Sequence, residues 1–326
     1  MNTDQSFIVV AISAYIMSTL AFLIYLLSRE RWAKLVGIPF AILGCVVQFV
    51  ELGYRYETSH IWPLTNLYGS LSLFSAMSVA IFIAFAFKYD FWFIGGFVEA
   101  LAAGFLAYGL TWDEGYLPAV PALQSYWIKI HVPLVVSSYA AFLVAFATAL
   151  LFLIKYYGER WLARSGTVRS LRAAAATGPS LSSVTVATAA LGDQPVVRGY
   201  RESEIIEAAA ARGDRFALWL ATLPSLAKLD IMTYRIIAIG LPLITVGIIT
   251  GAWWAKEAWG AYWQWDPKET AALFSWIVYA SYMHLHTRNA WRGVRCAWLS
   301  AFGFLTIIFC YLGVNIWISG LHSYKM

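Results

Sequence analysis

Charged residues are scarce in this chain of 326 residues. Only 13% of them are charged, whereas 60% are hydrophobic and the mean hydropathy is +0.65. A typical soluble domain carries about 25% charged residues. The composition therefore excludes an ordinary soluble domain. It predicts a protein whose partner along most of its length is a lipid bilayer, with no nucleic-acid partner.

Cysteine is also rare, and the familiar cofactor motifs are missing. The three cysteines, Cys45, Cys296 and Cys310, lie in or at the ends of apolar runs, and no Cys-x-x-Cys occurs. The chain therefore has no dithiol redox pair and no motif for covalent attachment of haem to itself. Gly-x-Gly-x-x-Gly and Walker-type phosphate loops are absent too. We expect three buried, unreactive thiols.

Long apolar runs, by contrast, are abundant. A transmembrane helix needs about 20 predominantly apolar residues. Eight such runs occur, at residues 7–27, 37–53, 67–87, 91–110, 131–154, 236–254, 270–285 and 296–317. The first is not a convincing signal peptide, because acidic Asp4 precedes it and no small-x-small cleavage site closes it. The sequence predicts an all-α, polytopic integral membrane helix bundle of about eight transmembrane helices.

Basic residues favour one orientation of these helices. Lys and Arg concentrate in cytoplasmic loops, and short loops carry most of this information. The short loops 28–35 and 286–295 together contain six of them, which places both loops on the inner side. Both termini are then expected on the outer, extracytoplasmic side.

This orientation divides the chain into three expected parts. Residues 1–155 contain helices one to five with their outer loops, and residues 234–326 contain helices six to eight. Between them, residues 156–233 form a cytoplasmic segment. Its part from about 164 to 197 is rich in small and polar residues and lacks periodicity, which predicts disorder. Residues 201–220 are a candidate amphipathic helix.

Tryptophan is concentrated in one outer loop, residues 253–269. Five tryptophans fall within thirteen residues, namely Trp253, Trp254, Trp259, Trp263 and Trp265. Tryptophans at a membrane interface commonly form an aromatic belt, which is one interpretation of this segment. Such density also suits a shelf that packs against a large planar apolar ligand.

The same loop ends in a helix start signal. Asp266, Pro267 and Glu269 match the N-cap, the first position and the capping-box partner of a helix. Capping alone explains Asp266 and Glu269, but it does not explain Lys268 or Lys256. At the edge of an aromatic shelf, these two ammonium groups suit the carboxylates of a bound ligand.

Histidine is rare as well, with five in the chain. His131 and His322 are expected at helix ends on the outer face, and His60 in an outer loop. His284 and His286 lie near the inner end of helix seven, on different faces because they are two residues apart. Each, taken alone, is equally well explained as a solvated interfacial histidine. A planar ligand with carboxylates, flanked by two outer histidines, suggests haem, with His131 and His322 as its natural axial pair.

These motifs together resemble a known family. The stretch TGAWWAKEAWGAYWQWDPKET, residues 250–270, resembles the tryptophan-rich WWD signature of haem-handling proteins in cytochrome c maturation. Within that family it is most similar to the CcsA/ResC subunits, called CcsB in some bacteria, of the system II cytochrome c synthase. Residues 60–71, 121–132, 229–255 and 313–324 resemble further segments of the same family.

The resemblance implies roles for individual residues. His131 and His322 match the two outer histidines that ligate haem iron. His284 matches an inner haem ligand, and the second ligand at that site comes from a ResB-type membrane partner. His60 and His286 receive no ligand role. The implied haem-binding loop contributes Trp253, Trp254, Trp259, Trp263, Trp265, Asp266 and Lys268.

The resemblance also implies a reaction. Haem b would enter at the inner site and move to the outer site, on the extracytoplasmic face of a bacterial cytoplasmic membrane. There an apocytochrome c would present Cys-x-x-Cys-His, kept reduced by proteins of a thiol-reducing pathway, and its thiols would add to the haem vinyl groups. Such a lyase would be active only with its partner. A haem exporter without lyase activity, and a bis-histidine electron-transfer cytochrome, are the alternatives.

Three features lie outside this scheme. Gly69 stands where the family often has glutamate. Glu99 lies midway along helix four, where an ionisable side chain marks function by default. A proton relay, a pairing with a group such as Asn315, and a protonated carboxyl bonded between helices are the alternatives for it. Ser72, Ser75 and Ser78 recur every three residues and predict a close-packed helix face.

Overall fold

The computed structural model describes residues 3–113, 115, 121–164 and 214–318, and the regular structure among them is helical. Within these described residues, seven stretches are long and apolar enough to cross a membrane. They are α1 (Thr3–Ser28), α2 (Arg31–Ser59), α3 (Leu67–Tyr89), η1 (Trp92–Ile94) with α4 (Gly95–Leu110), α5 (Ile128–Arg164), α10 (Leu226–Trp259), and α12 (Val294–Ile308) with η3 (Phe309–Gly313) and α13 (Val314–Trp317). The eighth run is helical in α11 (Pro267–His286), which is not among the seven. The predicted all-α polytopic membrane bundle is confirmed; the side on which the termini lie stays a prediction.

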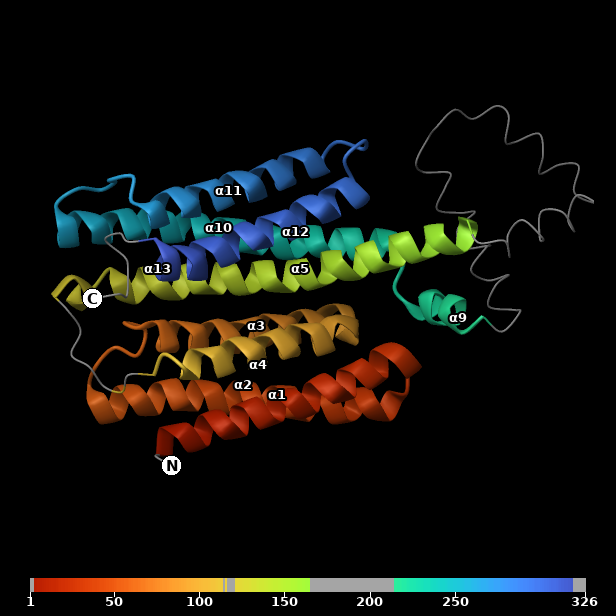
Figure 1. The fold of residues 1–326 in the computed structure, drawn as a ribbon, viewed down its shortest axis with the longest axis horizontal. Coiled ribbons are helices and arrows are strands. Elements are labelled where there is room, and N and C mark those ends of the chain that lie inside the picture. Colours follow the sequence, from red (N-terminus) through yellow and green to blue (C-terminus); the bar gives the residue numbers. More distant parts are fainter. Residues whose placement is uncertain (1–2, 114, 116–120, 165–213, 319–326) are drawn as a thin grey trace, which may run out of the picture. The chain divides into compact units, whose positions relative to one another are not determined.

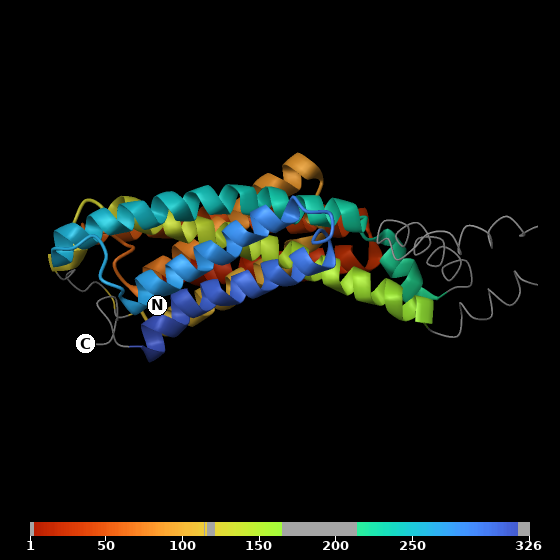
Figure 2. The same ribbon diagram turned by 90° about the horizontal axis from the view of Figure 1, so that it is seen from above.

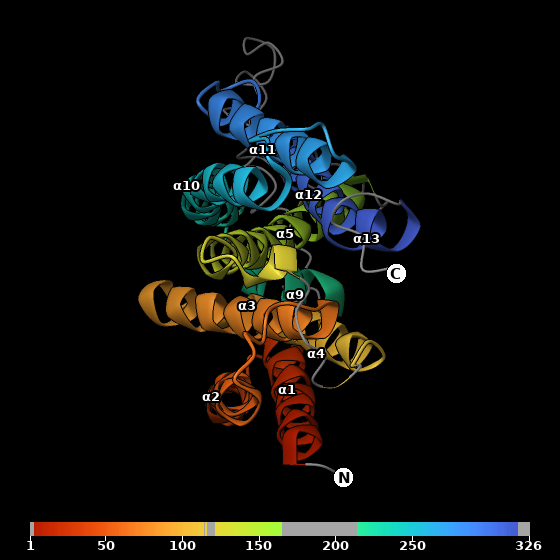
Figure 3. The same cartoon turned by 90° about the vertical axis from the view of Figure 1, so that its left-hand side faces the viewer.

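Helices α1 to α4 pack as one group, in which α1 contacts α2 and α4, and α3 contacts the same two helices (Figures 1 and 3). Small residues allow the close approach. A Cβ on Gly44 of α2 would stand 2.6 Å from the Tyr15 ring of α1. The predicted close-packed face of α3 is confirmed, because Ser72, Ser75 and Ser78 are fully buried. Ser75 Oγ donates a hydrogen bond to the Ala102 carbonyl of α4 (2.8 Å).

A second group contains α10 to α13 and the part of α5 that precedes residue 151. In Figure 3 this part of α5 lies between α3 and the helices α10 and α12. Its aromatic side chains fix the packing: Phe142 stacks on Tyr279 of α11 with ring centroids 3.6 Å apart. The Tyr311 hydroxyl in the π-helical stretch η3 donates to Ser70 Oγ of α3 (3.0 Å), which joins the two groups.

Residues 151–228 form a separate compact unit. Within it, Lys155 of α5 donates to the carbonyls of Leu220 and Leu223, at the end of α9 (Arg215–Thr222). Asp214 caps α9 with its carboxylate. The stretch predicted to be disordered lies outside the described residues, as does the predicted amphipathic helix except for its last residues, which belong to α9.

Candidate functional site

The tryptophan-rich loop begins where α10 ends and closes with the predicted capping box. The Asp266 carboxylate accepts a hydrogen bond from the Lys268 N–H (3.0 Å), and Glu269 accepts one from the Asp266 N–H (3.3 Å). Pro267 takes the first helical position, so the predicted start of α11 is confirmed. Gly260 and Trp265 have positive φ values of 82° and 56°, which turn the chain back toward the bundle.

This loop covers an open pocket that encloses about 1130 Å³ of empty space, its mouth included. The loop, the start of α5 and the loop between α2 and α3 lie at the same end of the bundle (Figures 1 and 2). All three contribute to the wall. The pocket is lined by Leu64, Thr65, Leu123, Ile128, His131, Val132, Val135, Tyr139, Ile244, Ile248, Gly251, Ala252, Trp254, Trp259, Tyr262, Trp263, Lys268, Glu269 and Ala272.

His131 lies in the first turn of α5 and lines this pocket. Its Nδ1 is 2.8 Å from the carbonyl oxygen of Gly247 on α10. A carbonyl can only accept, so this contact requires the proton on Nδ1 and leaves the lone pair of the neutral ring on Nε2. The ring also stacks on Trp254, with centroids 5.8 Å apart. A Cβ on Gly251 would lie 2.7 Å from the imidazole, so only glycine leaves room for it there.

The five tryptophans do not share one environment. Trp254, Trp259 and Trp263 line the pocket, and the Trp254 and Trp259 rings pack together with centroids 4.8 Å apart. Trp253 instead packs on Trp127 at the start of α5 (4.7 Å). Trp265 is 69% exposed and touches the edge of Trp263. The Trp263 indole N–H is buried and lacks a hydrogen-bond partner among the described residues.

Lys268 brings a cation to the pocket wall. Its ammonium group donates to Asn315 Oδ1 of α13 (2.9 Å), and Asn315 Nδ2 donates in turn to the Tyr311 carbonyl (2.6 Å). Lys268 precedes the apolar run of α11, and burial lowers the pKa of its ammonium group, while Cys310 and Asp266 oppose that shift. Lys256 is different: it is exposed and donates to the Gly260 carbonyl (2.8 Å).

The structure also shows how the other polar groups singled out from the sequence are placed. The suggested pairing of Glu99 with Asn315 is wrong, because Lys268 and the Tyr311 backbone hold the Asn315 amide. Glu99 itself is fully buried in α4. Cys45, Cys296 and Cys310 are buried and free of disulfides, as predicted.

The two histidines near the other end of α11 differ as predicted. His284 is exposed, whereas His286 is buried on another face of the helix. The Nε2 of His286 lies 2.9 Å from the Asp230 carboxylate of α10, and its ring stacks on Tyr234 with centroids 4.6 Å apart. His322 lies outside the described residues, so its predicted place beside His131 stays a prediction.

Sequence reasoning missed most of the pocket wall. The apolar lining residues of α5 and α10 have no signal that separates them from other residues of a membrane helix. Leu64 and Thr65 are in the loop after α2, far in sequence from the tryptophans. Among the described residues, no group of three or more His, Cys, Asp or Glu side chains is placed to hold a metal ion. The pocket wall itself consists mostly of apolar and aromatic side chains, which suit a large, mostly apolar ligand.

The fold and the pocket together define a polytopic helical membrane protein with an aromatic-lined pocket at one end of its bundle. The family model described as cytochrome C assembly protein matches residues 64–322. A protein of Heterosigma akashiwo named cytochrome c biogenesis protein CcsA is 38% identical over 288 residues, which cover 87% of this chain and 83% of that protein. A protein of the same name from Synechococcus elongatus is 36% identical over 277 residues, covering 84% of this chain and 82% of that protein. The chain belongs to the cytochrome c assembly protein family.

A solved structure extends the likeness in fold. The chain is similar to cytochrome c heme lyase CcmF with a TM-score of 0.58 and 14% identity. The match covers 94% of this chain, but the chain spans only 46% of that structure. At this identity the likeness concerns the fold alone.

Proposed function

We propose that this chain is the haem-handling subunit of a system II cytochrome c synthase. In this role it holds haem b as a substrate in the aromatic pocket, on the extracytoplasmic face of a bacterial cytoplasmic membrane. With a ResB-type partner it attaches the haem to the Cys-x-x-Cys-His segment of an apocytochrome c. Membership of the cytochrome c assembly family and the name CcsA of its relatives support this proposal.

The single observation that carries the proposal is the hydrogen bond between His131 and the Gly247 carbonyl. This Nδ1–H···O=C hydrogen bond is the kind of outer-shell contact that orients a metal-binding imidazole and makes it a better ligand. The lone pair on Nε2 is then suited to haem iron. His322 supplies the other axial ligand in this proposal, as the resemblance of its segment implies.

The remaining pocket groups suit the rest of a haem molecule. Trp254 and Trp259 offer flat apolar surface to the macrocycle. The buried indole N–H of Trp263 and the ammonium group of Lys268 are donors suited to the haem propionates. Trp253 and Trp265 support this loop from outside the pocket, and Asp266 fixes its end by capping α11.

The chemistry requires positioning rather than a general acid or base. Each cysteine thiol adds across one vinyl group: sulfur bonds to one vinyl carbon and hydrogen is gained by the other, with no net change of oxidation state. The substrate thiols must be kept reduced, which a thiol-reducing pathway would ensure. Holding vinyl and thiol together in a water-poor pocket supplies the rate advantage of a preassembled reaction.

An inner haem site completes the proposed path. His284 is exposed in the last turn of α11, so a ligand from a ResB-type partner could share one iron with it. His286 is not available for this purpose, because it is buried against Asp230. A chain with one accessible inner histidine is poorly suited to be a self-contained bis-histidine electron-transfer cytochrome.

The test is to express the chain with a ResB-type partner and a Cys-x-x-Cys-His reporter, and to record the spectrum of the purified complex. We expect ferrous bis-histidine haem and covalently modified reporter. His131→Ala and His322→Ala should each lose the outer haem and leave the reporter unmodified. His60→Asn is the matched control, because asparagine tolerates the left-handed conformation of that residue. Unmodified reporter with haem bound to the wild type would instead indicate a haem exporter, and full activity of His131→Ala would refute the ligand assignment.

A further inference from the structure

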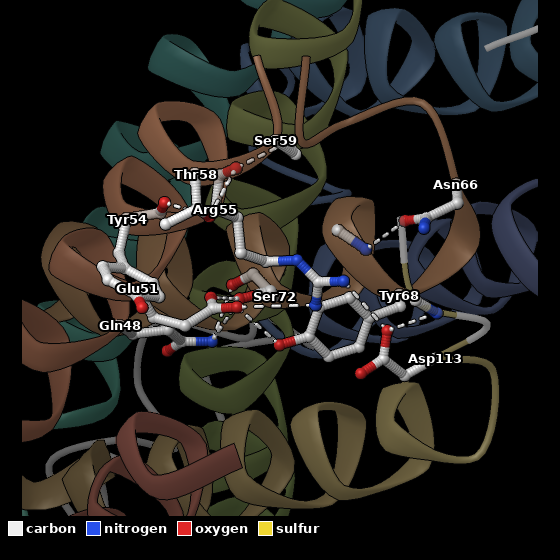
Figure 4. Close-up of polar contacts among 12 residues, drawn as sticks. Gln48, Glu51, Tyr54, Arg55, Thr58, Ser59, Asn66, Tyr68, Ser72 and Asp113 are labelled. Atoms are coloured by element: carbon white, nitrogen blue, oxygen red, sulfur yellow. Dashed lines mark hydrogen bonds and ion pairs between the residues drawn. The ribbon is translucent and has the colours of Figure 1, made fainter. Parts of the chain in front are cut away.

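A buried ionic network lies between α2, α3 and the end of α4 (Figure 4). Glu51 is fully buried and Arg55, one turn later on α2, is 4% exposed. The Arg55 guanidinium lies 2.9 Å from the Asp113 carboxylate and 3.6 Å from that of Glu51. One planar cation therefore joins a carboxylate of α2 to one in the segment after α4, a geometry that lysine cannot reproduce.

Helix α3 completes this network from the other side. The Tyr68 hydroxyl donates to one Glu51 oxygen (2.7 Å), and Ser72 Oγ donates to the other (3.2 Å). The Arg55 guanidinium also lies over the Tyr68 ring, 4.3 Å from its centroid. Figure 4 shows these side chains converging from α2, α3 and the segment after α4. Well-paired buried ionic groups contribute little net stability, and in some proteins they serve to specify one geometry.

The loop of residues 60–66 is tied at both ends to the helices that carry this network, α2 and α3. At its start, Ser59 Oγ donates to the Arg55 carbonyl (2.6 Å) and accepts from the Ile61 N–H (3.1 Å). At its end, Asn66 caps α3 by accepting from the Gly69 N–H (2.8 Å). The loop also packs directly on the first turn of α3, because a Cβ on Gly69 would lie 1.7 Å from the Pro63 carbonyl oxygen.

The same loop is a wall of the aromatic pocket. Leu64 and Thr65 line the pocket that contains His131. Thr65 also borders a small polar hollow whose other wall includes Arg55 and Ser59. The loop therefore lies between the ionic network and the pocket proposed to hold haem, and Thr65 lines the cavity on each side.

We propose that Arg55, with Glu51 and Asp113, is a positioning group for the outer haem site. The network holds the 60–66 loop in place and so sets how closely the pocket wall encloses the haem and excludes water from it. Arg55 touches neither the iron nor the reacting vinyl groups in this proposal, which rests on the proposed function.

The first test reads the loop without haem. Thr65→Cys is introduced after the three native cysteines are replaced, and its labelling by a membrane-impermeant maleimide is timed in membranes. We expect labelling about 10-fold faster when Arg55→Gln is added, because the local opening of the loop becomes easier. Arg55→Lys should give an intermediate labelling rate, since lysine keeps the positive charge but lacks the planar guanidinium that contacts both carboxylates. Lys34→Gln, which breaks the ion pair of Lys34 with Asp90 (2.7 Å), is the control and should leave labelling unchanged.

The second test reads the haem in the complex with its partner. Arg55→Gln and Arg55→Lys should retain haem, with a shifted absorption spectrum and a lower midpoint potential as water reaches the ring. Asp113 lies beyond the end of α4, so Asp113→Asn is the variant to use if Arg55→Gln does not accumulate in the membrane. It should shift the haem spectrum and the midpoint potential in the same direction, but by less.

The outcomes separate the two proposals. Unchanged labelling and unchanged haem spectra in Arg55→Lys and Asp113→Asn would overturn the positioning role while haem binding stands. If the Arg55 variants are labelled faster but the wild-type complex never carries haem, the role of the network in holding the loop is supported and the proposed function is overturned.

Discussion

Gly251→Ala tests the proposed haem ligand with a single methyl group. In the structure, a Cβ at this position would lie 2.7 Å from Cε1 and 2.8 Å from Nδ1 of His131, whereas ordinary contact begins at 3.4 Å. The imidazole must therefore retreat from α10 by about 0.7 Å. A movement of that size along the hydrogen bond takes Nδ1 from 2.8 Å to about 3.5 Å from the Gly247 oxygen, the limit of a hydrogen bond.

The magnitude follows from what this bond does. Loss of the outer-shell partner of a metal-binding histidine typically costs about 10- to 100-fold in affinity or activity. Fold stability should not fall in parallel, because alanine within a helix is favoured over glycine by about 0.5–1 kcal/mol. We therefore expect weaker haem binding and less covalent reporter at a similar unfolding temperature.

The assay is a haem titration of the purified complex, with the haem-to-protein ratio and reporter staining measured alongside. Gly104→Ala on α4 is the matched control, since nothing lies within 4 Å of a Cβ there. It should match the wild type in both measurements. Wild-type haem affinity and spectrum in Gly251→Ala would refute the reasoning, because His131 could then not be the ligand that this geometry describes.

Three further substitutions address the loop and its support. Trp263→Phe keeps an aromatic ring but removes the buried indole N–H, so haem affinity should fall about 5- to 10-fold. This loss corresponds to one hydrogen bond of about 1–1.4 kcal/mol. In the same titration, the exposed Trp265→Phe should stay near the wild-type affinity. Asp266→Ala removes the cap of α11 and should lower the free energy of unfolding by about 1 kcal/mol, whereas Asp266→Asn, which can still cap, should lose less in the same denaturation experiment. Gly69→Ala would place a Cβ 1.7 Å from the Pro63 carbonyl oxygen, so the loop must shift; thermal unfolding well below the wild-type temperature is expected, and an unaltered melting curve would contradict the close packing of loop on helix.

Local physics in the sequence determined the existence of the helices and the start of α11. Apolar runs of bilayer length become helices because the lipid leaves backbone groups no other partners. The N-cap of α11 was predictable from Asp266 and Glu269 because all of its atoms lie within four residues. The different faces of His284 and His286 follow from helical periodicity in the same way.

The tertiary structure alone decided which of these residues meet. His131 finds its acceptor at Gly247, 116 residues away, and Arg55 finds Asp113, 58 residues away. Trp253 and Trp254 are neighbours in sequence, yet one packs on Trp127 and the other lines the pocket. Sequence patterns specify periodicity and capping, which are local. Which side chain fills which space depends on close packing between helices, and that packing exists only once the bundle has assembled.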